Sequence, residues 1–149
     1  MAEKLFKKYK KQFITTLGKK ALDDAQLTEL GRNIFGDKYI GTFAQDKYPM
    51  NKNGFAIVNK DTSKKINTDD AHWVAIYSTK TRLYIYDSFG RHTSFVLPII
   101  YEKAQKHHKK IYESKRDPEQ YGYTEVCGHL ATAWLCVVKE LGVRKALTI

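Results

Sequence analysis

The chain has 149 residues, a formal net charge of +10 at pH 7 and two cysteines. This length suits a single domain, to which we assign residues 1–149. No run of about 18 apolar residues occurs, which excludes a transmembrane helix, and the charged N-terminus lacks the apolar core of a secretory signal. Two cysteines cannot form a disulfide framework, so we expect reduced thiols and a reducing, intracellular compartment.

Residues 1–20 form a basic segment with seven lysines and one glutamate. Its apolar residues approximate one helical face, and they are Leu5, Phe6, Tyr9, Phe13, Ile14 and Leu17. Two interpretations stay open. The segment is either an amphipathic helix that packs on the domain with its lysines in solvent, or a surface for DNA or another polyanion.

A short helix and a buried strand are expected next. Asp23 and Asp24 are acidic residues suited to a helix start, and Gly36 is suited to its C-terminal cap. A long, partly irregular connection follows. Residues 55–59, Phe-Ala-Ile-Val-Asn, then predict a short buried strand, and the polar residues 61–70 predict a turn-rich connection.

Two stretches rich in aromatic and β-branched residues, from His72 to Ser78 and from Arg82 to Asp87, predict an antiparallel hairpin. With a loop of two or four residues centred between positions 79 and 80, paired positions sum to 159. His72 would then face Asp87, with β-carbons about 5 Å apart. A three-residue loop would separate them. A carboxylate beside an imidazole fixes its tautomer and makes it a better base.

The region that follows is predicted to be a helix and then a strand. Residues 95–110 look helical, with Pro98 tolerable only in the first turn, and residues 109–113 could add a strand. A second group of basic residues lies here, namely Lys103, Lys106, Lys109, Lys110, Lys115 and Arg116. It is either a solvated face or a patch that faces DNA.

An apolar run from Leu130 to Leu141 predicts a buried helix, with Cys127 at or near its first turn. Unpaired N–H groups and the helix dipole would favour a thiolate there. Cys127 is therefore the candidate nucleophile, with His72 as its base. Gln120, in the loop before the helix, could donate to an oxyanion together with the Cys127 backbone N–H.

We interpret three further residues of the chain, a tryptophan, a histidine and a cysteine, mainly as structural. Trp73 faces away from His72, so it belongs to the core or helps to shape the site. His129 is expected to be a near-core histidine. Cys136 would lie about 13 Å along the helix from Cys127, too far for a disulfide. The spacing of cysteines and histidines is not that of a metal site, so we expect no metal.

The ordered set of His72, Asp87, Gln120 and Cys127 resembles the adenain-type cysteine proteases. These viral maturation enzymes are distantly related to the proteases of SUMO and other ubiquitin-like proteins. The resemblance covers roughly positions 26 to 141. Its matching pieces are Gly41-Thr-Phe, Ala56-Ile-Val-Asn59, His72-Trp73, Asp87-Ser-Phe-Gly90, and Gln120 with Cys127-Gly128.

This resemblance implies an α+β fold related to papain but permuted in chain order. A mixed or antiparallel sheet would pack on a central buried helix that starts at the nucleophile, with Trp73 and Gly128 shaping the site. The resemblance also implies a monomeric cysteine endopeptidase that cleaves capsid precursor proteins, often at glycine pairs. It would act in the virion and infected cell of a small DNA virus such as a virophage, or in a related mobile element.

Adenain is stimulated by DNA, so the resemblance names viral DNA as a candidate activator and requires no other cofactor. Asp87 stands where adenain has glutamate. Lys109 stands where adenain has the cysteine that holds its activating peptide, so a disulfide-linked peptide is not expected. Two alternatives stay open: an isopeptidase for ubiquitin-like proteins with the same site, and a non-enzymatic, basic DNA-binding virion protein.

Overall fold

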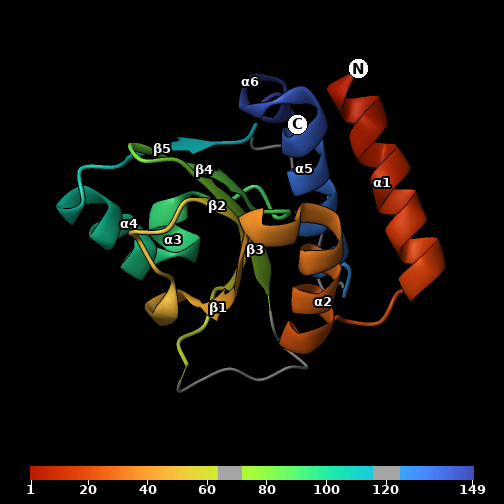
Figure 1. The fold of residues 1–149 in the computed structure, drawn as a ribbon, viewed down its shortest axis with the longest axis horizontal. Helices are drawn as coiled ribbons and strands as arrows, with labels where there is room; N and C mark the ends of the chain where they lie inside the picture. Colours follow the sequence, from red (N-terminus) through yellow and green to blue (C-terminus); the bar gives the residue numbers. More distant parts are fainter. Residues whose placement is uncertain (64–71, 116–124) are drawn as a thin grey trace.

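The structure, a computed structural model, describes residues 1–63, 72–115 and 125–149 (Figure 1). Its helices are α1 (Ala2–Leu17), α2 (Asp24–Phe35), α3 (Thr93–Val96), α4 (Pro98–Lys106), α5 (Cys127–Leu141) and α6 (Val143–Ala146), with 3₁₀ turns η1 (Gly36–Lys38) and η2 (Gln45–Lys47). Its strands are β1 (Tyr39–Ala44), β2 (Gly54–Asn59), β3 (Trp73–Ser78), β4 (Arg82–Tyr86) and β5 (Lys110–Glu113).

Within the described residues, the strands form one sheet in the order β1-β2-β3-β4-β5. The outer pairs, β1 with β2 and β4 with β5, are parallel, whereas the inner pairs are antiparallel. Helices α3 and α4 make the crossover that a parallel β4–β5 pair requires. The fold is therefore α+β with a mixed sheet, as the sequence predicts.

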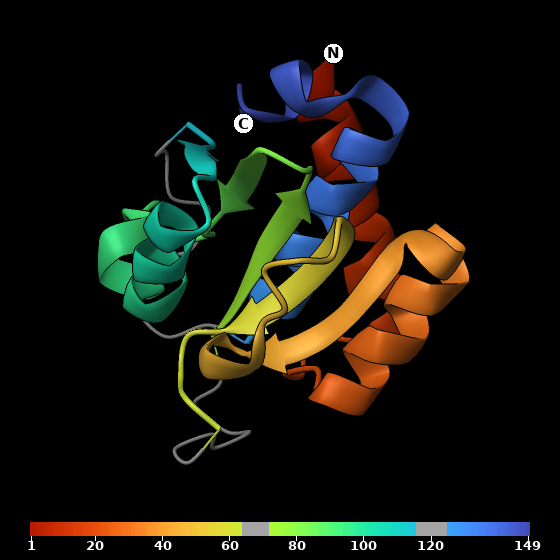
Figure 2. The same ribbon diagram turned by 60° about the vertical axis from the view of Figure 1, so that its left-hand side comes forward.

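Helices cover both faces of the sheet (Figure 2). Alternate residues of β2 show the two sides, because side chains of a strand point to opposite faces. Phe55 and Ile57 join the core beneath α1, α2 and α5. Ala56 and Val58 join the core beneath α3 and α4. Every residue of β2 is buried for this reason.

Helix α5 lies between β3 and α1 (Figure 1) and is buried from Cys127 to Val138. The prediction of a central buried helix that begins at the cysteine is confirmed. The basic N-terminal segment is also helical, since α1 packs on the outside of α5 with Phe6 and Phe13 buried. No helix in the described ranges is both long and apolar enough to cross a bilayer.

The predicted register of the β3–β4 hairpin is wrong by two residues. Ser78 pairs with Leu83, so paired positions sum to 161, not 159. The Thr79 N–H donates to the Arg82 carbonyl at 2.9 Å and closes the turn one residue later than expected. Because the register is shifted by an even number of residues, each side chain keeps its predicted face of the sheet.

The predicted helix over 95–110 is divided in two and ends earlier. Helix α3 ends at Val96 and α4 begins at Pro98, with Leu97 between them at φ −131° and ψ 63°. Proline disfavours helical geometry in the residue before it but suits the first helical position. The predicted helix before Gly36, the strand after Gly54 and the strand near residue 110 are confirmed.

Candidate active site

His72 and Asp87 meet at the edge of the sheet where β3 begins and β4 ends. His72 immediately precedes β3 and Asp87 immediately follows β4. The two strands are antiparallel, so these positions share one edge. His72 Nε2 lies 2.5 Å from Asp87 Oδ1, and both side chains are buried. The predicted contact is confirmed, although the observed register makes it diagonal, a separation that long side chains can bridge.

The Asp87 carboxylate receives bonds from the segment that follows it as well as from His72. The Phe89 N–H lies 3.3 Å from Oδ1, and the Arg91 N–H lies 3.1 Å from Oδ2. Arg91 Nε also donates to Oδ2, at 2.9 Å. The sequence reasoning missed Arg91, because only the folded loop brings this side chain back to Asp87.

Cys127 is the first residue of α5, and its sulfur lies against the peptide bond that joins His72 to Trp73. The Trp73 N–H donates to Cys127 Sγ at 3.4 Å. The thiol is buried, with the residue 2% exposed. Helix α5 and strand β3 therefore bring the cysteine to the segment that carries the histidine, from 54 positions away in the sequence.

The predicted stabilisation of a Cys127 thiolate is outweighed by the effect of burial on the pKa of the thiol. Burial raises the pKa of the thiol, and the negative charge of Asp87 raises it further. Hydrogen bonds from the Trp73, Gly128 and Cys127 backbone N–H groups lower the pKa but do not cancel the effect of burial. In the free protein, Cys127 is therefore a thiol at neutral pH, and it needs a base to become a nucleophile.

His72 has the protonation state of a base. Burial lowers its pKa, and the bond to Asp87 opposes this without reversing it. Burial alone would raise the pKa of Asp87, but bonds from His72 and Arg91 outweigh it and bring the pKa to about 2. At neutral pH, the pair is therefore an ionised carboxylate beside a neutral imidazole. Asp87 occupies Nε2, which leaves Nδ1 as the nitrogen for proton exchange.

Gln120, the predicted oxyanion donor, lies outside the described residues. Trp73 is a core residue whose indole N–H donates to the Leu22 carbonyl at 3.0 Å. Its backbone N–H donates to the Cys127 sulfur. Gly128 allows close packing, because a β-carbon there would lie 3.2 Å from a methyl group of Leu27.

The interpretations of His129 and Cys136 agree with the structure. His129 is fully buried, and its Nε2 bonds to the Gly18 carbonyl at 2.8 Å, as expected for a core histidine. Cys136 is a free buried thiol whose pKa burial raises to about 12. In the described ranges, no three His, Cys, Asp or Glu residues are grouped as metal ligands would be.

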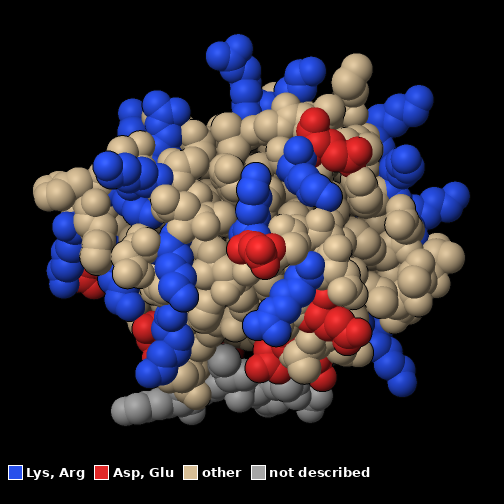
Figure 3. All heavy atoms as spheres, in the orientation of Figure 1, with Lys and Arg blue, Asp and Glu red and all other residues tan. Residues whose placement is uncertain are grey.

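Basic side chains are spread over the face in Figure 3, with acidic residues among them. Part of the second basic group is engaged within the fold. Lys103 Nζ donates to the Asp46 carbonyl at 3.2 Å, and Lys109 Nζ donates to Ser78 Oγ at 3.0 Å. These two lysines therefore have roles in the fold.

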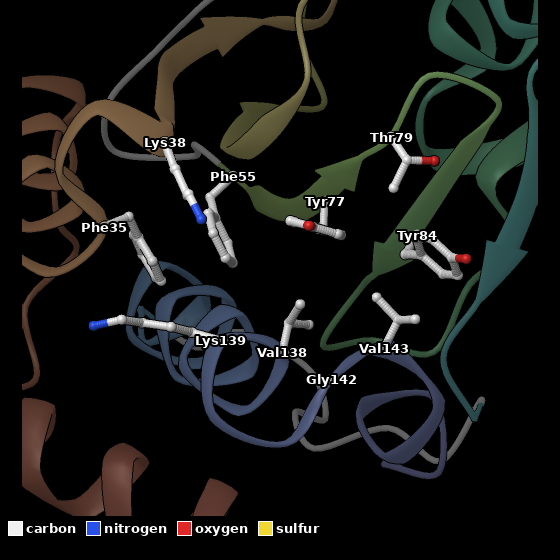
Figure 4. A pocket seen from close by; sticks show the side chains of 10 residues that line it. All are labelled: Phe35, Lys38, Phe55, Tyr77, Thr79, Tyr84, Val138, Lys139, Gly142 and Val143. Atoms are coloured by element: carbon white, nitrogen blue, oxygen red, sulfur yellow. The ribbon is translucent and has the colours of Figure 1, made fainter.

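A cavity of about 430 Å³ lies at the opposite end of α5 from Cys127 (Figure 4). It is lined by Phe35, Lys38, Phe55, Tyr77, Thr79, Tyr84, Val138, Lys139, Gly142 and Val143. Since α5 has 15 residues, its two ends are about 20 Å apart. The cavity is therefore separate from Cys127, His72 and Asp87.

A thiol, a neutral imidazole and an ionised carboxylate thus gather at one edge of the sheet. This set of groups suits acyl transfer through a covalent intermediate. A comparison of the chain with models of known protein families and with curated proteins finds no match.

Proposed function

We propose that this chain is a cysteine endopeptidase with the permuted papain-like fold of the adenain type, acting on virion precursor proteins. The observation that carries the proposal is the buried His72–Asp87 pair together with the Cys127 sulfur, which accepts a hydrogen bond from the backbone N–H of the residue after His72, where the central helix starts. A buried imidazole–carboxylate pair next to a thiol has little value for packing, since buried polar groups are costly to place. It has direct value for nucleophilic catalysis.

Acylation follows from the protonation states at neutral pH. Cys127 Sγ attacks the carbon of the scissile carbonyl while its proton passes to His72. Asp87 holds the ring through Nε2 and stabilises the imidazolium that forms. The oxyanion is held by the Cys127 backbone N–H and, in the proposal, by Gln120. His72 then gives its proton to the leaving amine, the C–N bond breaks, and a thioester forms.

Deacylation uses the same groups. His72 takes a proton from water as the water oxygen attacks the thioester carbon. The C–S bond breaks, Cys127 recovers its proton from His72, and the product leaves with a new carboxyl group. Because burial raises the pKa of the Cys127 thiol in the free protein, in the proposal the proton passes to His72 during the attack.

The test compares the two cysteines of α5. Cys127→Ala should abolish cleavage of a peptide library, whereas Cys136→Ala removes a buried thiol nine positions further along the same helix and should keep activity. A peptide aldehyde should form a thiohemiacetal with Cys127 and protect it from alkylation. An active Cys127→Ala protein would refute the proposal.

The substrate class needs a second comparison. Capsid precursor proteins and a ubiquitin-like fusion should be offered to the same enzyme, with and without DNA. Preferential cleavage of the capsid precursors supports the proposed function. Preferential cleavage of the fusion identifies an isopeptidase, and DNA binding without any cleavage identifies a non-enzymatic virion protein.

A further inference from the structure

We propose that Arg91 is a positioning residue for the catalytic pair: it fixes the Asp87 carboxylate in the orientation that bonds His72. This inference rests on the proposed function for its kinetic consequences. The orientation of the carboxylate itself is inferred from the contacts of Asp87 alone.

The two carboxylate oxygens of Asp87 have different closest partners. Oδ2 accepts from Arg91 twice, from the backbone N–H at 3.1 Å and from Nε at 2.9 Å. Oδ1 accepts from the Phe89 N–H at 3.3 Å and lies 2.5 Å from His72 Nε2. A carboxylate held through both oxygens cannot rotate about its bond to the chain. Oδ1 therefore stays aimed at the imidazole.

Arg91 is itself held in place. Its guanidinium lies over the Phe89 ring, 4.9 Å from the centroid. The same ring lies 4.8 Å from the His72 imidazole, centroid to centroid. The loop from Asp87 to Arg91 is closed by the Gly90 N–H, which donates to the Asp87 carbonyl at 2.9 Å. Gly90 accommodates this turn at φ 69°. Arg91, Phe89 and His72 thus form one packed layer around the carboxylate.

The geometry at Asp87 requires the planar guanidinium of an arginine and not merely a positively charged side chain. A second guanidinium nitrogen of Arg91 lies 3.5 Å from Oδ1, so the planar group spans both carboxylate oxygens. Lysine would keep the charge but has a single donor nitrogen. Among the residues that the structure describes, the charged groups that act on the pKa of His72 are Asp87, Arg91 and Lys60, so Arg91→Lys preserves the sign of each of them.

The test uses Arg91→Gln and Arg91→Lys, with Arg82→Gln as the control. Arg82 stands at the other end of β4, where its guanidinium also lies over an aromatic ring and makes one side-chain hydrogen bond, to Tyr84. In the Arg91 variants, kcat should fall at least about tenfold with KM unchanged, because the charge-assisted contacts of the guanidinium with the two carboxylate oxygens are lost or weakened. The Arg82 variant should keep both constants.

A spectroscopic measurement separates positioning from loop stability and needs no activity. In proton NMR, the ring N–H shared between His72 and Asp87 should give a strongly downfield resonance in the wild-type protein. That resonance should broaden or move upfield in both Arg91 variants and persist in Arg82→Gln. If it persists in folded Arg91 variants, or if Arg91→Lys restores full kcat, the inference is overturned. A wild-type protein that shows the resonance but cleaves no peptide refutes the proposed function alone.

Discussion

Replacing Asp87 by asparagine should remove a pH-dependent part of the stability of the protein. Burial would raise the pKa of the carboxyl, but the bonds from His72 and Arg91 bring it to about 2, against an ordinary value of 3.8. The pKa of the folded state is thus the lower one. The carboxylate therefore contributes its full stabilisation above pH 3.8 and loses it as the pH falls through about 2.

The size of this contribution follows from the shift. The pKa falls from 3.8 to about 2, and at about 1.4 kcal/mol per pKa unit the stabilisation is ~2 kcal/mol. The Asp87 side chain is 2% exposed, so solvent does not screen the interactions that cause the shift. At neutral pH, Asp87→Asn should lower the free energy of unfolding by at least this amount, because Arg91 also loses its charged partner.

Urea denaturation followed by tryptophan fluorescence measures the effect. The difference in unfolding free energy between the wild type and Asp87→Asn should shrink by ~2 kcal/mol as the pH falls from about 5 to about 2. Asp37→Asn, which removes an exposed carboxylate, serves as the control for general acid effects. If the wild type and Asp87→Asn lose stability in parallel over this range, the carboxylate is not held ionised by its neighbours and the reasoning fails.

Three further predictions test other features. Phe6→Ala removes a fully buried ring of α1 and should lower the free energy of unfolding by ~3 kcal/mol; an effect as small as that of the exposed-site control Lys11→Ala, in urea denaturation, would mean that α1 is not part of the core. Gly54→Ala places a β-carbon 2.2 Å from the Lys38 carbonyl oxygen at φ +137° and should cost ~3 kcal/mol in the same measurement, so a stable variant would contradict the close approach. Iodoacetamide labelling, mapped by mass spectrometry, should modify Cys127 only slowly at neutral pH and faster as the pH rises, because burial raises its pKa; rapid labelling at neutral pH would show that the thiolate is already formed.

The sequence alone determined the elements that build the site. The run from Leu130 to Leu141 is apolar almost all round, and such a helix has to be buried over most of its surface wherever the chain places it. The alternation and composition of residues 72–87 likewise identified a hairpin with His72 and Asp87 near its open end. These features depend on local periodicity, which the sequence carries directly.

Tertiary structure decided the hairpin register, the partners of Asp87 and the protonation state of Cys127. The turn that sets the register closes between Thr79 and Arg82, one residue later than composition indicated. Arg91 reaches Asp87 only because the loop after β4 folds back on itself. The position of Cys127 at a helix start favoured a thiolate, but burial raises the pKa of the thiol by more than the backbone N–H groups lower it. Local sequence fixes the helix end, whereas the cost of desolvation depends on every element packed around the sulfur.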